Sequence, residues 1–156
     1  MLKITVVAMG NKMPAWVVEA TQEFAKRLQE HCQFNLIELP LKPRTASCDV
    51  SKVLEQEAQM IMAHIPNQAR LMILDIEGQS FDSHQLAHRL QQLQLHSSHW
   101  CFVIGAPEGL AESVRQHAHE RWSLSKLTLP HPLARVVLFE ALYRGFAILK
   151  NHPYHK

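Results

Sequence analysis

The chain has 156 residues, of which 47% are hydrophobic and 19% are charged, and its formal net charge is +2 at pH 7. These values are typical of a single globular domain that can bury an apolar core, so we treat residues 1–156 as one domain. No apolar run approaches the roughly 20 residues of a membrane span, and the first residues begin a strand pattern instead of a signal peptide. Three cysteines without a C-x-x-C pairing indicate a reducing compartment, so the sequence predicts a cytoplasmic protein with no membrane association.

The charge is distributed unevenly along the chain. Residues 1–110 contain nine Lys/Arg and eleven Asp/Glu, whereas residues 111–156 contain seven and three. A basic C-terminal third is what a polyanion-binding face would look like. A solvated helix face explains so small an excess equally well, and both interpretations remain open.

Apolar spacing predicts strands and helices in alternation. Pro14 suits the first turn of a helix, Ser83 can cap another, and Glu77-Gly78 is expected to end the third strand. In chain order the sequence predicts a strand Leu2–Met9, a helix from Pro14 to about His31, a strand Phe34–Leu39, a loop Leu41–Ser47, a helix Asp49–Ile65, a strand Leu71–Ile76, a helix Ser83–Leu95, a strand Trp100–Ile104, a helix Leu110–Glu120, a strand-like segment Trp122–Leu129 and a helix Pro132–Lys150.

Five strands that alternate with helices predict a mainly parallel sheet of the α/β class. The last helix has apolar surface around much of its girth, so it needs burial on more than one side. A large core of one chain or a partner subunit could provide that burial.

Candidate site residues follow the last three strands, because ligands of parallel sheets bind beyond the carboxyl ends of the strands. These ends are Asp75–Gly78, Gly105–Gly109 and Leu129–His131. No G-x-G-x-x-G, no G-x-x-x-x-G-K-[ST] and no H-E-x-x-H occurs. The sequence therefore predicts neither a phosphate loop nor a metal site.

The segment Trp122–Pro132 interleaves leucines with small polar residues and ends in two prolines around His131. Proline pushes the preceding residue out of the helical region, so His131 is expected in extended backbone before a helix that starts at Pro132. Buried main-chain groups in such a segment need partners, which an adenine ring could supply. The alternative is a core strand that leads into a helix.

Five motifs in the right order resemble the ribosomal RNA large-subunit methyltransferase H family, whose members are small SPOUT methyltransferases. That family has an α/β knot fold. The resemblance therefore implies a mainly parallel sheet of five to six strands, helices on both faces and a C-terminal trefoil knot. The motifs are Val6–Trp16, Leu74–Gly78, Ile104–Leu110, Trp122–Pro132 and Asn151–His155.

The resemblance also implies an activity. Members are homodimers that use S-adenosylmethionine to methylate N3 of a pseudouridine in the helix 69 loop of 23S rRNA. They act on the assembled 70S ribosome or its large subunit, and they need no metal. Because the basic excess is small for tight binding to naked RNA, we expect the tail of one subunit to lie near the cofactor of the other.

By position, the resemblance places cofactor contacts at Leu74, at Gly105 and along one continuous segment. The first departure from the family pattern is Ala106, which replaces a glycine and is tolerable only if its φ is below zero. Lys126 is expected to point outward within the segment. The segment comprises Leu124, Ser125, Lys126, Leu127, Thr128 and Leu129.

The resemblance places RNA contacts at His131, Arg144, Tyr154 and Lys156, the last replacing an arginine that is common in the family. A neutral histidine suits the general base for the imide proton, which makes His131 the first candidate for catalysis and Tyr154 its rival. The alternative for Arg144 is a salt bridge with Glu140 four residues earlier.

Two acidic residues have open roles. Asp75 and Glu108 could face the sulfonium or the ribose, or could cap a loop or helix. Two other functions also stay open: a ribosome-binding or assembly factor without catalysis, and a flavodoxin-like nucleotide binder. The absence of a phosphate loop after the first strand disfavours the second.

Overall fold

The computed structural model describes residues 1–156 and contains one five-stranded sheet in which every pair of neighbouring strands is parallel. The predicted α/β class and parallel sheet are confirmed. The strands are β1 (Lys3–Met9), β2 (Gln33–Leu39), β3 (Arg70–Ser80), β4 (His99–Ile104) and β5 (Glu120–Ser123), in the spatial order β2-β1-β4-β3-β5. The helices are α1 (Ala15–Leu28), α2 (Val50–His64), α3 (Ser83–His96), α4 (Glu112–His117) and α5 (His131–Leu149).

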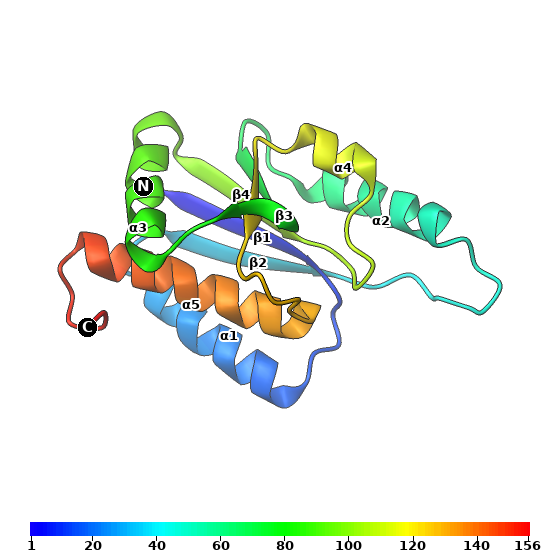
Figure 1. Cartoon of the computed structure of the whole chain (residues 1–156), viewed down its shortest axis with the longest axis horizontal. Coiled ribbons are helices and arrows are strands. Elements are labelled where there is room, and N and C mark those ends of the chain that lie inside the picture. The colour runs from blue at the N-terminus through cyan, green and yellow to red at the C-terminus, as the bar shows by residue number, and fades with distance from the viewer.

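Helices cover both faces of the sheet, and each face has its own apolar core. Alternate β1 residues divide between the two cores, with Ile4 and Val6 on one face and Val7 and Met9 on the other. The first core packs against α1, α3 and α5, and the second against α2 and α4 (Figure 1). This side-chain alternation over near-continuous apolar strands is what a doubly covered parallel sheet requires.

Helix α5 lies between α1 and α3 and is buried within the chain along much of its length. Leu138, Phe139, Leu142 and Phe146 all belong to the larger core. Gly145 permits a close approach to α3, because a Cβ there would lie 2.6 Å from Leu90 Cδ1. Of the two sources of burial considered for this helix, the core of its own chain supplies a large part.

The third strand does not end at Glu77-Gly78 as predicted but runs to Ser80. After a register shift, pairing with β5 resumes at Gln79, opposite Trp122. A Cβ on Gly78 would lie 2.6 Å from the Arg121 carbonyl carbon, so glycine here lets the β3 backbone pass close to β5. Asp82, and not Ser83, caps α3 in a complete capping box with Gln85.

The elements around β5 are shorter than predicted. Helix α4 ends at His117 because His119 and Glu120 belong to the sheet edge: the His119 N–H donates to the Leu71 carbonyl at 2.8 Å. Strand β5 ends at Ser123, whose hydroxyl donates to the Ser125 carbonyl and turns the chain. His131 is the first residue of α5 and is not extended. The trefoil knot stays a prediction.

Candidate functional site

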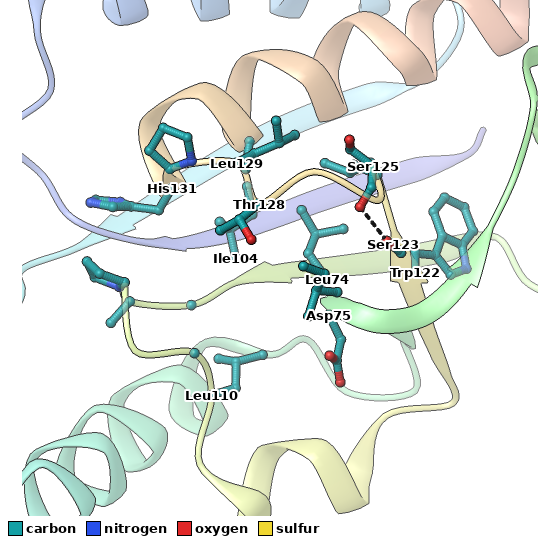
Figure 2. Close-up of a pocket in the computed structure, with 18 of the residues that line it drawn as sticks. Leu74, Asp75, Ile104, Leu110, Trp122, Ser123, Ser125, Thr128, Leu129 and His131 are labelled. Carbon is teal, nitrogen blue, oxygen red and sulfur yellow. Dashed lines mark hydrogen bonds between the residues drawn. The ribbon is translucent and has the colours of Figure 1, made fainter.

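A cavity of about 430 Å³ lies beside the middle of β3 and beyond the carboxyl ends of β4 and β5. Its walls come from three segments far apart in sequence: Leu74–Ile76 within β3, the loop after β4 that begins at Gly105, and the segment between β5 and α5 (Figure 2). Ten of its twenty lining residues are hydrophobic. A volume within ~300–1,000 Å³ and a largely apolar lining are typical of a small-molecule site.

The segment 124–129 offers unpaired main-chain groups to this cavity. No main-chain N–H or C=O of these six residues bonds to another main-chain group, although backbone pairing is dense elsewhere. The local bonds are from side chains: Ser123 Oγ donates to the Ser125 carbonyl, and the Leu127 N–H donates to Ser125 Oγ at 2.9 Å. Polar groups beside an apolar cavity need partners, so this segment is suited to reading the edge of a planar heterocycle.

Five of the six predicted segment residues line the cavity, as do Leu74 and Gly105. Lys126 is exposed and does not line it, consistent with the expected outward orientation. Leu127 and Ile76 both line the cavity although 76% and 57% of their surfaces are exposed. Two large apolar side chains exposed at a cavity mouth would bury their surface against an entering ligand.

Position 105 in the cavity wall has no room for a side chain. A Cβ there would lie 2.7 Å from Leu110 Cδ2 and 2.8 Å from the Gly109 carbonyl oxygen. Gly109 has φ +99° and its N–H donates to the Ala106 carbonyl at 2.8 Å, closing a tight loop. Ala106 is not among the residues with positive φ, so alanine is accommodated there without backbone strain.

Asp75 lines the cavity and is held by two contacts within the chain. Its carboxylate accepts the Glu77 N–H at 3.0 Å and lies 3.1 Å from Arg115 Nη2 on α4. The side chain is 8% exposed. Asp75 therefore stabilises the part of β3 where the register shifts and still presents a carboxylate at the cavity.

Glu108 does not line the cavity but ties its loop to a distant segment. Arg44, from the loop that precedes α2, contacts Glu108 at 3.1 Å and the buried carboxylate of Glu57 at 2.6 Å. These bonds hold the pKa of Glu108 below its usual value, the side-chain hydrogen bond from Arg44 being the largest cause, and raise the pKa of Arg44. The loop predicted as Leu41–Ser47 is thus pinned to α2 and to the cavity loop by one side chain.

His131 lines the cavity from the first turn of α5. Burial lowers its pKa, and the positive charge of Arg135 lowers it further, against smaller opposing effects of the Met9 main chain and Glu108. The imidazole is therefore neutral at pH 7 and able to accept a proton. Its Nδ1 atom is buried beside the Met9 main chain without a hydrogen bond of ordinary geometry.

The other predicted RNA contacts lie at the opposite end of α5. Tyr154 donates its hydroxyl to Glu140 at 3.0 Å, and its ring lies 4.8 Å from the Arg144 guanidinium. Arg144 also pairs with Glu140 at 2.8 Å, so the predicted alternative, the i,i+4 salt bridge, is present. Burial, and then the bond to Glu140, raises the pKa of Tyr154, and Lys156 is exposed.

His131 and Arg144 are thirteen residues apart on one helix, a separation of about 20 Å along its axis. The tail turns back against α1 and α5, away from the cavity of its own chain (Figure 1). The structure thus brings His131 together with the cofactor-segment residues and does not bring it together with Arg144, Tyr154 or Lys156.

Two arginines that contact groups around the cavity were not identified from the sequence. Arg44 lies in the predicted loop Leu41–Ser47, and Arg135 lies in the predicted helix Pro132–Lys150. Arg135 is 1% exposed and lies four residues after His131 on an otherwise apolar helix face. A charged residue on the buried stripe of a helix was the available signal.

Two further observations bear on the kind of site. No three or more His, Cys, Asp or Glu side chains lie together where they could hold a metal ion. None of the helices combines the length and the hydropathy needed to cross a bilayer.

Comparison with known proteins gives consistent matches over the whole chain. A family described as "Predicted SPOUT methyltransferase" matches residues 2–155. The chain is 53% identical over 156 residues to the ribosomal RNA large subunit methyltransferase H of Legionella pneumophila (strain Paris), with both chains covered in full. It is 45% identical to the protein of the same name from Teredinibacter turnerae (strain ATCC 39867 / T7901), covering 99% of this chain and 100% of the relative.

A solved structure also resembles this fold. It is described as a probable methylase family protein from Haemophilus influenzae Rd KW20, and it aligns with a TM-score of 0.54 at 13% identity. The alignment covers 98% of this chain and 70% of that chain. At this identity the match shows a shared fold.

Proposed function

Because this chain belongs to the SPOUT methyltransferase family, among the ribosomal RNA large subunit methyltransferases H, and is therefore a methyltransferase, we propose that it methylates 23S rRNA with S-adenosylmethionine as donor. The proposed target atom is N3 of a pseudouridine in the helix 69 loop. The proposed working form is a homodimer that acts in the cytoplasm on the assembled 70S ribosome or its large subunit.

The observation that carries the cofactor proposal is that the main chain of residues 124–129, along an apolar cavity, makes no hydrogen bond to other main-chain groups. Adenine presents a flat apolar face and a donor-acceptor edge, which match leucine walls and free N–H and C=O groups. Gly105 lets the loop after β4 fold tightly against Leu110 and Gly109 beside the cavity. Asp75 offers an acceptor for a ribose hydroxyl or a counter-charge for a sulfonium.

The bound cofactor supplies an activated methyl group, so the chain's own residues have to align the nucleophile and take up one proton. The N3–C bond forms as the C–S bond breaks, and the imide proton of the pseudouridine passes to His131. A neutral imidazole at the cavity can accept that proton, whereas the Tyr154 hydroxyl already donates to Glu140 and has a raised pKa. Alignment can lower a barrier by up to ~7–11 kcal/mol, and a general base adds roughly 10²–10⁴ in rate.

The RNA site is proposed to form between two subunits. A separation of about 20 Å along α5 keeps the tail of one chain from its own His131. A second chain that places its Arg144, Tyr154 and Lys156 beside the first chain's cavity would complete the site. Tyr154 can then stack on a base, and the cations can contact phosphate.

Two measurements test this function. Titration calorimetry with S-adenosylmethionine should give saturable binding at one site per chain, and a non-catalytic assembly factor should give none. Mass spectrometry of 23S rRNA nucleosides should reveal N3-methylpseudouridine only in cells that contain the protein. Absence of that nucleoside difference would refute the proposed substrate.

The state of the substrate can be tested with the purified protein. Because the basic excess is small, ribosomal surfaces have to contribute to binding, and we expect 70S ribosomes to be methylated far faster than free helix 69 fragments. Equal rates on both substrates would contradict this part of the proposal.

A further inference from the structure

Arg135 is the one buried cation of the chain, and it contacts Gly10, which lies beside the His131 ring. The side chain is 1% exposed. Its Nη1 pairs with the Glu38 carboxylate on β2, and its Nη2 donates to the Gly10 carbonyl at 3.0 Å. An arginine buried this fully has to be paired and hydrogen-bonded. Groups from the carboxyl ends of β1 and β2 meet both conditions at the two terminal nitrogens, whereas the buried Nε has no hydrogen-bond partner.

The Gly10 peptide forms the surface against which the His131 ring packs. A Cβ on Gly10 would lie 3.3 Å from His131 Cε1 and 3.7 Å from its Nδ1. Gly10 has φ +104°, a conformation that favours glycine, and its N–H donates to the Leu39 carbonyl at 2.6 Å. Arg135 therefore holds the carbonyl of Gly10, and the main chain of β2 holds its N–H.

Arg135 also places a permanent charge one helical turn from the imidazole. Residues i and i+4 of a helix lie on the same face, so the guanidinium and the imidazole are neighbours. The other groups that act on the ring are the Met9 main chain and the Glu108 carboxylate, and Glu108 is itself paired with Arg44. A guanidinium keeps its charge at every pH of interest, so its effect on the ring is constant.

We propose that Arg135 is a positioning residue for His131: it holds the Gly10 peptide that orients the imidazole, and its charge keeps that imidazole in the neutral form. The proposal deepens the proposed function, because a neutral and fixed His131 is what proton transfer from N3 needs. The Glu38 carboxylate has a matching part, since it pairs with the guanidinium and partly neutralises its charge.

The test measures the titration of His131 by ¹H–¹⁵N NMR in the full-length protein. In Arg135→Met combined with Glu38→Gln, which removes both charges together, the midpoint of His131 should move up, because the Arg135 charge that lowers the pKa of His131 is lost. In Arg135→Lys the charge remains, so the midpoint should stay close to that of the wild type. An unmoved midpoint in the double variant would overturn the proposal.

A second variant covers the case in which the double variant does not fold. Glu38 is 37% exposed, so Glu38→Gln alone should be tolerated, and it leaves the Arg135 charge less neutralised. The midpoint of His131 should then move down, opposite to the shift in the double variant. A midpoint that stays or rises in Glu38→Gln would also contradict the proposal.

Activity separates this inference from the proposed function. If His131 is the base, the acidic limb of the kcat/KM profile on 70S ribosomes should shift with the NMR midpoint in each variant. If the NMR midpoint shifts and the kcat/KM profile does not, Arg135 still positions His131, and the assignment of His131 as general base is wrong.

Discussion

Among single residues, Gly105 has the least room for a side chain in the cavity wall. Gly105→Val would push a branched side chain against Leu110 and the Gly109 carbonyl, both within 3 Å of an added Cβ. We expect the Kd for S-adenosylmethionine to rise at least tenfold, a loss of about 1.4 kcal/mol, as measured by calorimetry.

The matched control for this change is the neighbouring residue. Ala106→Gly restores the glycine that is common in the family and removes only a methyl group from a position with negative φ. Its affinity for the cofactor should stay within about threefold of the wild type, which is less than 1 kcal/mol. Equal affinities of Gly105→Val and Ala106→Gly would show that the ligand does not pass this wall.

Three half-buried histidines make the fold sensitive to acid. Burial is the largest cause that lowers the pKa of His31, His99 and His131 below 6.5. The unfolded chain therefore binds more protons than the folded chain as pH falls through 6.5, so the stability that neutral histidines contribute is lost in that direction. We expect Tm to fall between pH 7.5 and about 5.5, measured by calorimetry at constant ionic strength.

His31 offers a variant that checks this cause. Its ring stacks on Phe146 at 5.3 Å and 11°, and its Nδ1 is buried without a partner. His31→Phe keeps the stacked ring and removes the proton-binding group, so Tm should depend less steeply on pH. A slope unchanged from the wild type would assign the acid sensitivity to other groups.

Among the elements, the loop before α2 is held mainly by the side chain of Arg44. Arg44→Ala would remove the ion pairs of this loop with Glu57 and Glu108, keep only the main-chain bond from Lys42 to Glu57, and leave the Glu57 carboxylate, 2% exposed, without its partner cation. We expect faster hydrogen exchange across residues 41–48 and in the loop 105–109, a lower Tm, and several-fold weaker cofactor binding.

Lys42→Ala is the control for the Arg44 prediction. The Lys42 residue contributes its main-chain N–H to Glu57 at 2.9 Å, which alanine retains. Exchange rates and affinity should therefore match the wild type. If Arg44→Ala also behaved like the wild type, the loop would be held by other contacts.

How far the elements could be predicted from sequence depends on where their hydrogen-bond partners lie. The strands and long helices with a regular apolar period were predicted to within a few residues, because their patterns report local geometry. The limits of α4 and β5 were not, because His119 bonds to Leu71, 48 positions away. The same holds within β3. Local sequence predicts that the strand ends at Gly78, and only the close approach of β5 explains why a glycine lies within the strand.

The same distinction applies to the candidate site. The motif resemblance identified Leu74, Gly105 and the segment 124–129, and the structure gathers all of them except Lys126 around one cavity. The arginines that support them were missed, because the partners of Arg135 lie 97 and 125 positions away. Partners so far apart in the sequence cannot be recognised from local residue spacing.

For the whole molecule, the decisive question is whether one chain or two compose the active site. Subunits that carry His131→Ala and subunits that carry Tyr154→Ala should each be inactive as homodimers. If the site is shared, a mixed dimer of the two regains one intact site, with His131 from one subunit and Tyr154 from the other. We therefore expect methylation of 70S ribosomes to reappear after the two variants are unfolded together and refolded.

The opposite result is equally clear. If His131 and Tyr154 acted within the same chain, every site of a mixed dimer would lack one of them, and no activity would return. A wild-type protein refolded in the same way provides the reference for full recovery.

The arrangement of α5 has a consequence for how the gene can change. His131 lies at one end of this helix and the tail follows the other end, so the length of the helix sets the distance between His131 and the tail. Deletion of one residue from its middle would shorten it by about 1.5 Å and rotate the tail by about 100° relative to the cavity. Single-codon insertions and deletions within α5 should therefore be selected against, even where they leave the chain folded.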